Sequence, residues 1–93
     1  MYALICFDRP DSAALRDRHR AAHQEFLKTN SATIVFGGPL KNTADGPSTG
    51  ALIVVNCATL EEAEALIGAD PFYRGGVYES VAVRAFKQVF PPK

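Results

Sequence analysis

The chain is poor in the features that define several large classes of protein. Its 93 residues include no tryptophan, one methionine and two cysteines. No apolar run approaches the ~18 residues that a membrane-spanning helix requires. The apolar stretch at residues 1–7 is short and has no basic lead, unlike a signal peptide. We therefore expect a cytoplasmic protein that makes no use of a membrane.

The two cysteines, Cys6 and Cys57, both lie in apolar runs that are typical of strands. Neither belongs to a Cys-x-x-Cys pair or to a Cys/His set with metal-ligand spacing, which favours buried, reduced thiols over a disulfide or a zinc site. The sequence also contains no phosphate-binding loop, dinucleotide fingerprint or nucleophile motif. We expect no metal and no cofactor.

Charge is balanced, with ten basic and ten acidic residues, and 47% of the chain is apolar, as in an ordinary globular domain. The densest basic cluster runs from Arg16 to Arg20, but Asp17 interrupts it and Asp11 precedes it. This pattern is typical of a solvated helix face and not of a surface that follows phosphates. We expect one domain over residues 1–93, helped by oligomerisation because it is small, and no nucleic-acid partner.

Apolar periodicity predicts the order strand, helix, strand, strand, helix, strand. The strands are expected at residues 2–7, 32–36, 50–55 and 78–90, and the helices at residues 12–28 and 60–67. Asn30 is expected to end the first helix in the left-handed conformation. Gly37-Gly38-Pro39 is expected to end the second strand, and Thr59-Leu60-Glu61-Glu62 has the pattern of a capping box.

This order predicts an α+β, ferredoxin-like βαββαβ fold, in which a four-stranded antiparallel sheet carries both helices on one face. Most of the predicted strands are apolar on both sides, so the second face of the sheet needs a cover. We expect a homodimer in which two sheets face each other.

Asp70 stands before Pro71 in the turn after the second helix. Proline holds the preceding residue in an extended conformation, so the carboxylate has a fixed direction. One interpretation is an N-cap of a short helical turn that starts at Pro71. The other is a partner for His23, because a carboxylate on one ring nitrogen fixes the tautomer and leaves the other nitrogen free to accept a proton.

His23 lies in the first helix beside an apolar stripe formed by Leu15, Ala22 and Phe26. An isolated histidine in such a place more often packs than reacts. Arg20 lies one turn earlier on the same side and is a candidate for binding an anionic substrate group through two parallel hydrogen bonds. The commoner outcome is an exposed arginine or one paired with Asp70 or Glu25.

A pocket is expected where side chains disappear at the end of the second strand, around Gly38 and Pro39. Phe72, Tyr73 and Tyr78 are candidates to line an apolar pocket, although Phe72 can equally pin the turn to the core. His19 is a second candidate base, but its position nearer the middle of the apolar stripe favours packing.

Several short motifs together resemble the YciI-like (YCII-related) family of small dimeric α+β barrel proteins. They are Arg20-Ala21-Ala22-His23, Gly38-Pro39, Thr49-Gly50, Asp70-Pro71-Phe72 and Gly75-Gly76-Val77. The resemblance implies a ferredoxin-like fold, a dimeric α/β barrel joined through the sheets, and a His-Asp pair at His23 and Asp70 in a pocket near the dimer interface. The family is linked with small-molecule enzymes such as a dehydrochlorinase of chlorinated aromatic breakdown, and its fold is similar to that of muconolactone isomerase. This chain departs from the pattern at Asn30-Ser31, where relatives often have glycine.

The sequence therefore predicts a small cofactor-independent enzyme. In this hypothesis His23, oriented by Asp70, moves a proton on a small cyclic or aromatic substrate in a lyase or isomerase type of reaction. The alternative is a noncatalytic homodimer that binds a small molecule or serves as an accessory protein. An oxygenase with the same sheet architecture has only fold-level analogy in its favour.

Overall fold

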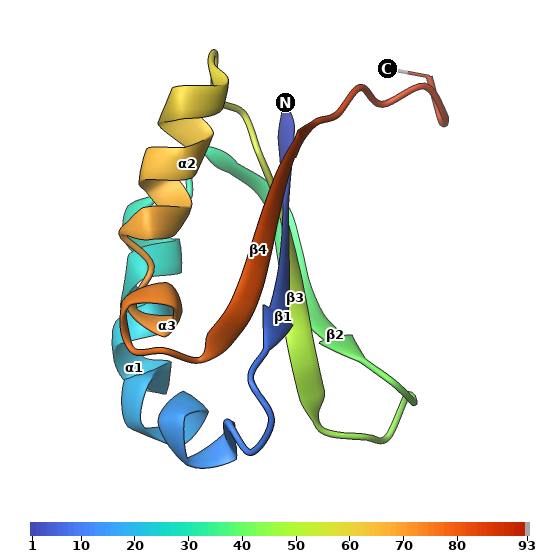
Figure 1. Cartoon of the computed structure of the whole chain (residues 1–93). Coiled ribbons are helices and arrows are strands. Elements are labelled where there is room, and N and C mark those ends of the chain that lie inside the picture. The colour runs from blue at the N-terminus through green and yellow to red at the C-terminus, as the bar shows by residue number, and fades with distance from the viewer. Residues whose placement is uncertain (93) are drawn as a thin grey trace.

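The computed structural model describes residues 1–92 and places three helices on one side of a single sheet (Figure 1). The elements are β1 (Tyr2–Asp8), α1 (Ala13–Thr29), β2 (Ile34–Lys41), β3 (Ser48–Val55), α2 (Leu60–Gly68), α3 (Pro71–Arg74) and β4 (Tyr78–Ala85). The strands pair antiparallel in the order β2-β3-β1-β4. This confirms the α+β, ferredoxin-like arrangement, with the single turn α3 added after α2. No helix in residues 1–92 has the length and apolar character needed to cross a membrane.

Side chains of β1 alternate between the two faces of the sheet. Leu4 and Cys6 point into the core beneath the helices and are 1% and 0% exposed. Phe7 points to the opposite face, which the helices leave uncovered in Figure 1, and it is 51% exposed. Phe36 pairs with Val54 on that same face and is 52% exposed. The second face is therefore apolar in part, as the sequence predicted, and the homodimer stays a prediction.

Helix α2 begins at the predicted capping motif. The Thr59 hydroxyl accepts a hydrogen bond from the Glu62 amide at 3.1 Å. The Glu62 carboxylate accepts from the Ala58 amide at 3.0 Å, one residue before the position that a standard capping box predicts. Ala63 and Ile67 form the buried side of this helix.

The prediction for β2 was wrong at both ends, because the strand starts at Ile34 and continues through Gly37, Gly38 and Pro39 to Lys41. β2 lies at the edge of the sheet and pairs only with β3. Proline is tolerated in an edge strand, where its nitrogen does not have to donate to a second neighbour. The two glycines and the proline therefore lie within β2 and do not end it.

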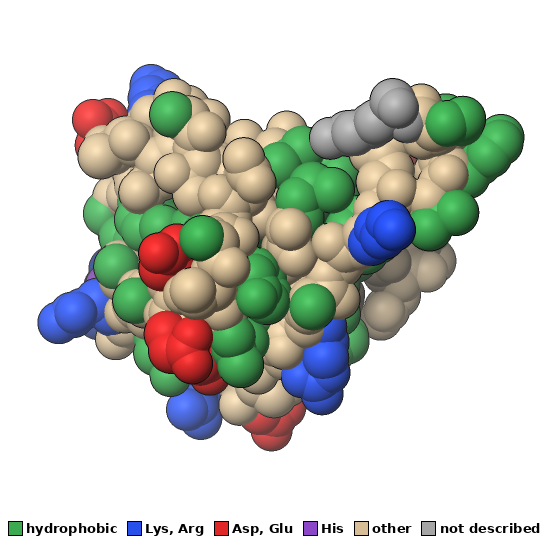
Figure 2. All heavy atoms as spheres, turned by 90° about the horizontal axis from the view of Figure 1, so that it is seen from above, with side chains coloured by type: hydrophobic (Ala, Val, Ile, Leu, Met, Phe, Trp, Pro, Cys, Tyr) green, Lys and Arg blue, Asp and Glu red, His purple; other side chains and the backbone are tan. Residues whose placement is uncertain are grey.

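The predicted last strand was too long. β4 ends at Ala85, which pairs with Tyr2, the first residue of β1. The Phe86 amide still donates to the Met1 carbonyl at 2.9 Å, just beyond the end of the strand. The segment after Phe86 leaves the sheet (Figure 1) and carries Val89 and Phe90, which are 76% and 86% exposed. Hydrophobic side chains also protrude at this end of the molecule in Figure 2.

Asn30 follows α1 but does not adopt the predicted left-handed conformation, since its φ is −102°. Its side-chain amide donates to the Phe26 carbonyl at 2.9 Å, and its backbone amide donates to the same oxygen at 3.1 Å. The side chain thus satisfies a carbonyl at the helix end without a left-handed residue. The non-glycine residue with positive φ is Asp11, before α1.

Candidate active site

His23 of α1 and Asp70, the residue before α3, meet in the interior. The two atoms closest to each other are His23 Nδ1 and Asp70 Oδ1, at 2.7 Å. The Asp70 side chain is fully buried and the His23 side chain is 13% exposed. Asp70 Oδ1 also accepts a hydrogen bond from the Phe72 amide at 2.9 Å, so it caps α3 as well. The two predicted roles of Asp70, as the N-cap of a short helical turn and as the partner of His23, are therefore both filled by the same oxygen atom.

The hydrogen bond defines what the imidazole of His23 can do. An ionised carboxylate only accepts hydrogen bonds, so this contact with an ionised Asp70 requires the hydrogen on Nδ1 of His23. In the neutral ring, Nε2 then has a free lone pair and can accept a proton. When it does, the positive charge of the ring lies next to the negative charge of Asp70. This is the arrangement of a general base with an orienting carboxylate.

Phe72 fixes the plane of the His23 ring. The two rings stack with centroids 3.9 Å apart and planes 9° apart. Tyr78 meets the Phe72 ring edge-on, with centroids 6.2 Å apart. Phe72 is 3% exposed, and it both pins the turn to the core and borders the neighbouring hollow.

A hollow of about 510 Å³ lies beside this pair, between α1 and the strands β2 and β3. Its volume is in the range of small-molecule pockets, ~300–1,000 Å³. Small side chains on the inner face of the sheet make room for it: Gly37 pairs with Ile53, and Pro39 pairs with Ala51. The predicted site residues that line it are Arg20, His23, Gly38, Pro39 and Phe72. The concavity was expected at a strand end and is found along the middle of an edge strand.

Tyr73 does not line this hollow. Its side chain is 48% exposed on the outside of α3, because successive residues of a helical turn point in different directions and Phe72 takes the inward one. The Arg20 side chain is 50% exposed, which is the commoner outcome considered for it, and its ion-pair partner is Asp17 and not Asp70 or Glu25. Arg20 nevertheless contributes to the rim of the hollow.

His19 packs, as its position predicted. Its ring lies against Gly75, and a β-carbon on Gly75 would collide with it. Ala22, assigned to the apolar stripe, is exposed. The inward side of α1 instead carries Arg16, His23 and Leu27.

Arg16 is the site residue that sequence analysis missed, since it was assigned to a solvated helix face. It is only 9% exposed. Its Nε lies 2.6 Å from Asp8 Oδ2, and its Nη2 lies 3.0 Å from Asp8 Oδ1 and donates to the Gly50 carbonyl at 3.1 Å. Burial alone would lower the pKa of Arg16, but the hydrogen bonds and charge of Asp8 raise it. One sequence signal could have indicated the position of Arg16. It stands seven residues before His23, a spacing that places the two residues on one side of a helix.

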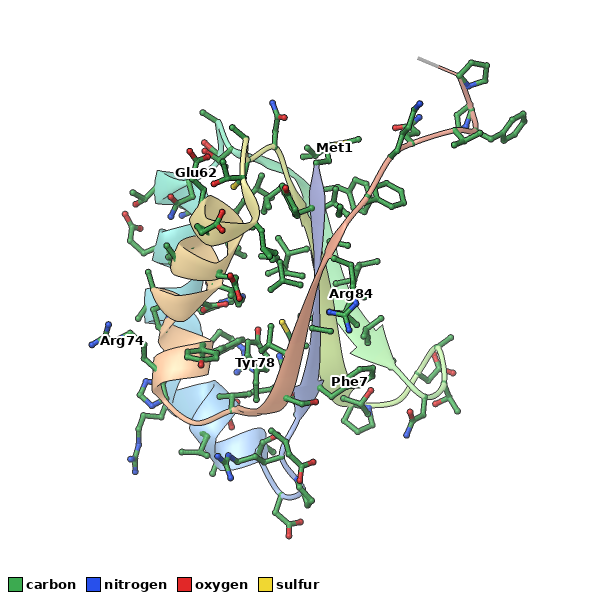
Figure 3. The ribbon with its side chains drawn as sticks, turned by 45° about the horizontal axis from the view of Figure 1, so that its top comes forward. Met1, Phe7, Glu62, Arg74, Tyr78 and Arg84 are labelled. Carbon is green, nitrogen blue, oxygen red and sulfur yellow. The ribbon has the colours of Figure 1, made fainter. Side chains whose placement is uncertain are left out.

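Asp70 and Tyr78 carry buried polar atoms without a partner. Within residues 1–92, neither Asp70 Oδ2 nor the Tyr78 hydroxyl has a hydrogen-bond partner. Figure 3 shows Tyr78 between the helices and the sheet, whereas Arg74 of α3 points away from them. Burial, and then the charge of Asp70, raise the pKa of Tyr78. The phenol is therefore neutral at ordinary pH.

Cys6 is a buried free thiol, and Cys57 is a partly buried one. Burial, and then the charge of Asp70, raise the pKa of Cys6 to about 12. Burial also raises the pKa of Cys57, followed by the charge of Glu62. Neither thiol is activated as a nucleophile. Residues 1–92 contain no group of three or more His, Cys, Asp or Glu side chains placed to hold a metal ion.

A family model of the YCII-related domain matches residues 1–87 of the chain. The chain belongs to the YCII-related family. Protein YciI from Escherichia coli O6:H1 and from Shigella flexneri are both 32% identical to it, over 97% of this chain and 99% of theirs. An uncharacterized protein of Haemophilus influenzae is 26% identical over 96% of this chain and 98% of its own. The resemblance carried by the short motifs is thus confirmed.

A solved structure is also similar to this YCII-related protein. It is the 5-chloro-2-hydroxyhydroquinone dehydrochlorinase TftG from Burkholderia phenoliruptrix AC1100, in complex with 2,5-dihydroxybenzoquinone. The two chains share 27% sequence identity and superpose with a TM-score of 0.85 over 92% of each. The comparison supports the fold over nearly the whole chain.

Proposed function

We propose that this YCII-related protein is a small cofactor-independent enzyme that moves a proton on a small cyclic or aromatic substrate, in a lyase or isomerase type of reaction. The observation that carries the proposal is the 2.7 Å contact between His23 Nδ1 and Asp70 Oδ1 at the wall of a hollow of about 510 Å³. The name of the solved relative, a dehydrochlorinase of a chlorinated hydroxyhydroquinone, supports this substrate class.

His23 Nε2 is the proposed base. It takes a proton from the substrate, and the electron pair of the broken bond stays with the substrate. Asp70 stabilises the imidazolium that forms, because the carboxylate is fixed by both the ring and the Phe72 amide. The same imidazolium can return the proton to another atom of the substrate or to a leaving group, which covers isomerisation and elimination.

The walls of the hollow suit a flat, mainly apolar ring. Phe72, Gly38 and Pro39 are the proposed contacts for its faces and edges. Arg20 at the rim is the proposed first contact for an anionic substituent, at the expense of its pair with Asp17. Tyr73 has no proposed part, since its side chain lies outside the hollow.

We further infer a homodimer formed through the uncovered face of the sheet. Phe7 and Phe36 expose half of their surface there, and a second copy would remove it from water. The free thiols of Cys6 and Cys57 support a reducing compartment such as the cytoplasm.

The second candidate is a noncatalytic homodimer that binds a small molecule in the same hollow. The favouring observation is that Asp70 Oδ1 caps α3, which gives this buried acid a structural role without any reaction. In that case His23 would only complete the hydrogen bonding of Asp70.

Two assays followed by NMR test the proposal. One measures conversion of 5-chloro-2-hydroxyhydroquinone, and the other measures exchange of carbon-bound hydrogen for deuterium in a panel of cyclic hydroxyketones. The wild type should act on at least one compound, and His23→Ala should lose ~10²–10⁴-fold in rate. Glu25→Ala, an exposed change on the same helix, is the matched control and should keep the rate. Undiminished turnover by His23→Ala would remove the proposal, and binding without turnover by the wild type would favour the noncatalytic candidate.

A further inference from the structure

Arg16 is a buried cation beside the hollow, and the proposed proton transfer does not use it. It lines the hollow that contains His23 and also a second hollow of about 590 Å³, whose lining includes Asp8 and Glu79. The guanidinium group thus stands between the two hollows, and a ligand in the first hollow can contact it.

The orientation of the guanidinium group of Arg16 is set by the protein. Nε and Nη2 form a two-pronged contact with Asp8, and Nη2 also donates to the Gly50 carbonyl. Within residues 1–92, Nη1 makes no hydrogen bond. Because the group is planar and its other nitrogens are held, Nη1 is a donor with a fixed direction, ready before any ligand binds.

Phe72 links Arg16 to His23. The guanidinium carbon of Arg16 lies 4.9 Å from the centroid of the Phe72 ring, and the His23 ring lies 3.9 Å from it. Along α1 the two residues are separated by about two turns, or ~10 Å. A small ring lying in the hollow can therefore contact the base at one end and the fixed donor at the other.

The charges favour a substrate that is neutral when it enters. Asp8 already balances Arg16, so the pair offers an incoming ligand no net charge, and the buried carboxyl group of Asp70 lies against the His23 ring. Proton transfer makes an imidazolium, which Asp70 stabilises, and at the same moment a negative charge on the substrate. That new charge is stabilised by a hydrogen-bond donor that is already held in place before the reaction.

Arg20 is less suited to this task than Arg16. Its side chain is 50% exposed and that of its partner Asp17 is 71% exposed, so water screens both charges and leaves the group mobile. The Arg16 side chain is 11% exposed and that of Asp8 5%. A donor that is buried and held in place stabilises developing charge more strongly.

We infer that Arg16 Nη1 binds the oxygen that becomes negative in the reaction, and that the substrate is a neutral cyclic phenol, enol or enolisable ketone. In the step, the substrate C–H or O–H bond breaks and an N–H bond forms at His23 Nε2. The electron pair moves onto the substrate oxygen, directly or through the ring, and that oxyanion accepts from Arg16 Nη1. This inference rests on the proposed function, and it names its substrate class.

The experiment uses 4-nitrophenol, whose ionised form alone is yellow, at near-neutral pH. The wild type should bind it saturably as the yellow anion, with the proton on His23. Arg16→Lys keeps a positive charge beside Asp8 but lacks Nη1, and should weaken binding of the anion by ~10-fold or more. Nitrobenzene, which has no hydroxyl, should bind both proteins within about a factor of two of each other, as read by ligand NMR.

Arg18→Lys, at an exposed arginine of α1 that lines neither hollow, is the matched control and should leave binding of the anion unchanged within about twofold. Asp8→Asn combined with Arg16→Gln removes both charges together, and it replaces Arg16→Lys if circular dichroism shows that the latter does not fold. Equal affinity of either folded Arg16 variant and the wild type, loss of binding in Arg18→Lys alone, or no saturable yellow complex with the wild type would overturn the inference.

His23→Ala separates this inference from the proposed function. If His23 is the base, this variant should bind 4-nitrophenol only in its colourless form. If it still forms the yellow complex and Arg16→Lys weakens that complex, Arg16 keeps its role and His23 loses its own. If His23→Ala loses the colour while Arg16→Lys does not, His23 stands and the role of Arg16 is refuted.

Discussion

The imidazole of His23 lies flat on the ring of Phe72, with centroids 3.9 Å apart and planes 9° apart. The Phe72 amide donates to Asp70 Oδ1, and the same oxygen lies 2.7 Å from His23 Nδ1, so the stacked pair and the acid form one unit. The direction of His23 Nε2 depends on this unit and not on α1 alone.

Phe72→Leu should therefore lower the stability of the fold and change the NMR signals of the His23 ring. Because Phe72 is 3% exposed, we expect the free energy of unfolding to fall. The loss should be about 1–2 kcal/mol, below the ~3–5 kcal/mol of a Phe→Ala change. The ring protons of His23 should move downfield in the NMR spectrum as the shielding of the aromatic ring is lost. Tyr73→Leu, on the exposed side of α3, is the control, and unchanged His23 signals in Phe72→Leu would contradict the stacking.

Asp8→Ala should lower the free energy of unfolding far more than the same substitution at an exposed aspartate. It leaves the charge of Arg16, whose side chain is 11% exposed, without its carboxylate. We expect a loss of about 3–5 kcal/mol in the free energy of unfolding, measured with urea. Asp17→Ala breaks the exposed pair with Arg20 and should cost less than about 1 kcal/mol. Similar losses in the two variants would contradict the burial of the Asp8–Arg16 pair.

The order of strands and helices and the meeting of His23 with Asp70 could be predicted, because apolar periodicity, Pro71 and the family motifs are local signals. The burial of Arg16 could not, since it depends on Asp8 and the Gly50 carbonyl, which only the folded sheet brings to α1. The end of β4 at Ala85 could not be predicted either, since it depends on the pairing of Ala85 with Tyr2 of β1 in the folded sheet. Likewise, Pro39 ends no strand because β2 lies at an edge.

Stability should fall at alkaline pH, and Cys6 should account for part of the slope. Its pKa is raised in the folded protein from 9.0 to about 12 by burial and by the charge of Asp70, so the folded state keeps a proton that the unfolded chain loses. The contribution is intact below pH 9 and is lost as the pH rises from 9 to about 12. The loss is at most ~1.4 kcal/mol per pH unit for one proton.

Urea unfolding at several alkaline pH values and one protein concentration measures this slope. Cys6→Ala should flatten it, whatever the variant costs at neutral pH. Tyr78 contributes in the same direction, since its pKa is raised as well. Equal slopes for the wild type and Cys6→Ala would show that the thiol is not held neutral by the fold.

The most direct test of the account is the tautomer of His23, read from the ¹⁵N chemical shifts of its ring nitrogens while the ring is neutral. With Asp70 accepting from Nδ1, the wild type should show a protonated Nδ1 and an unprotonated Nε2, the nitrogen that serves as the base. Asp70→Asn should lose this preference. A wild-type ring protonated at Nε2 would contradict the account, because Nε2 could not then accept a proton from a substrate.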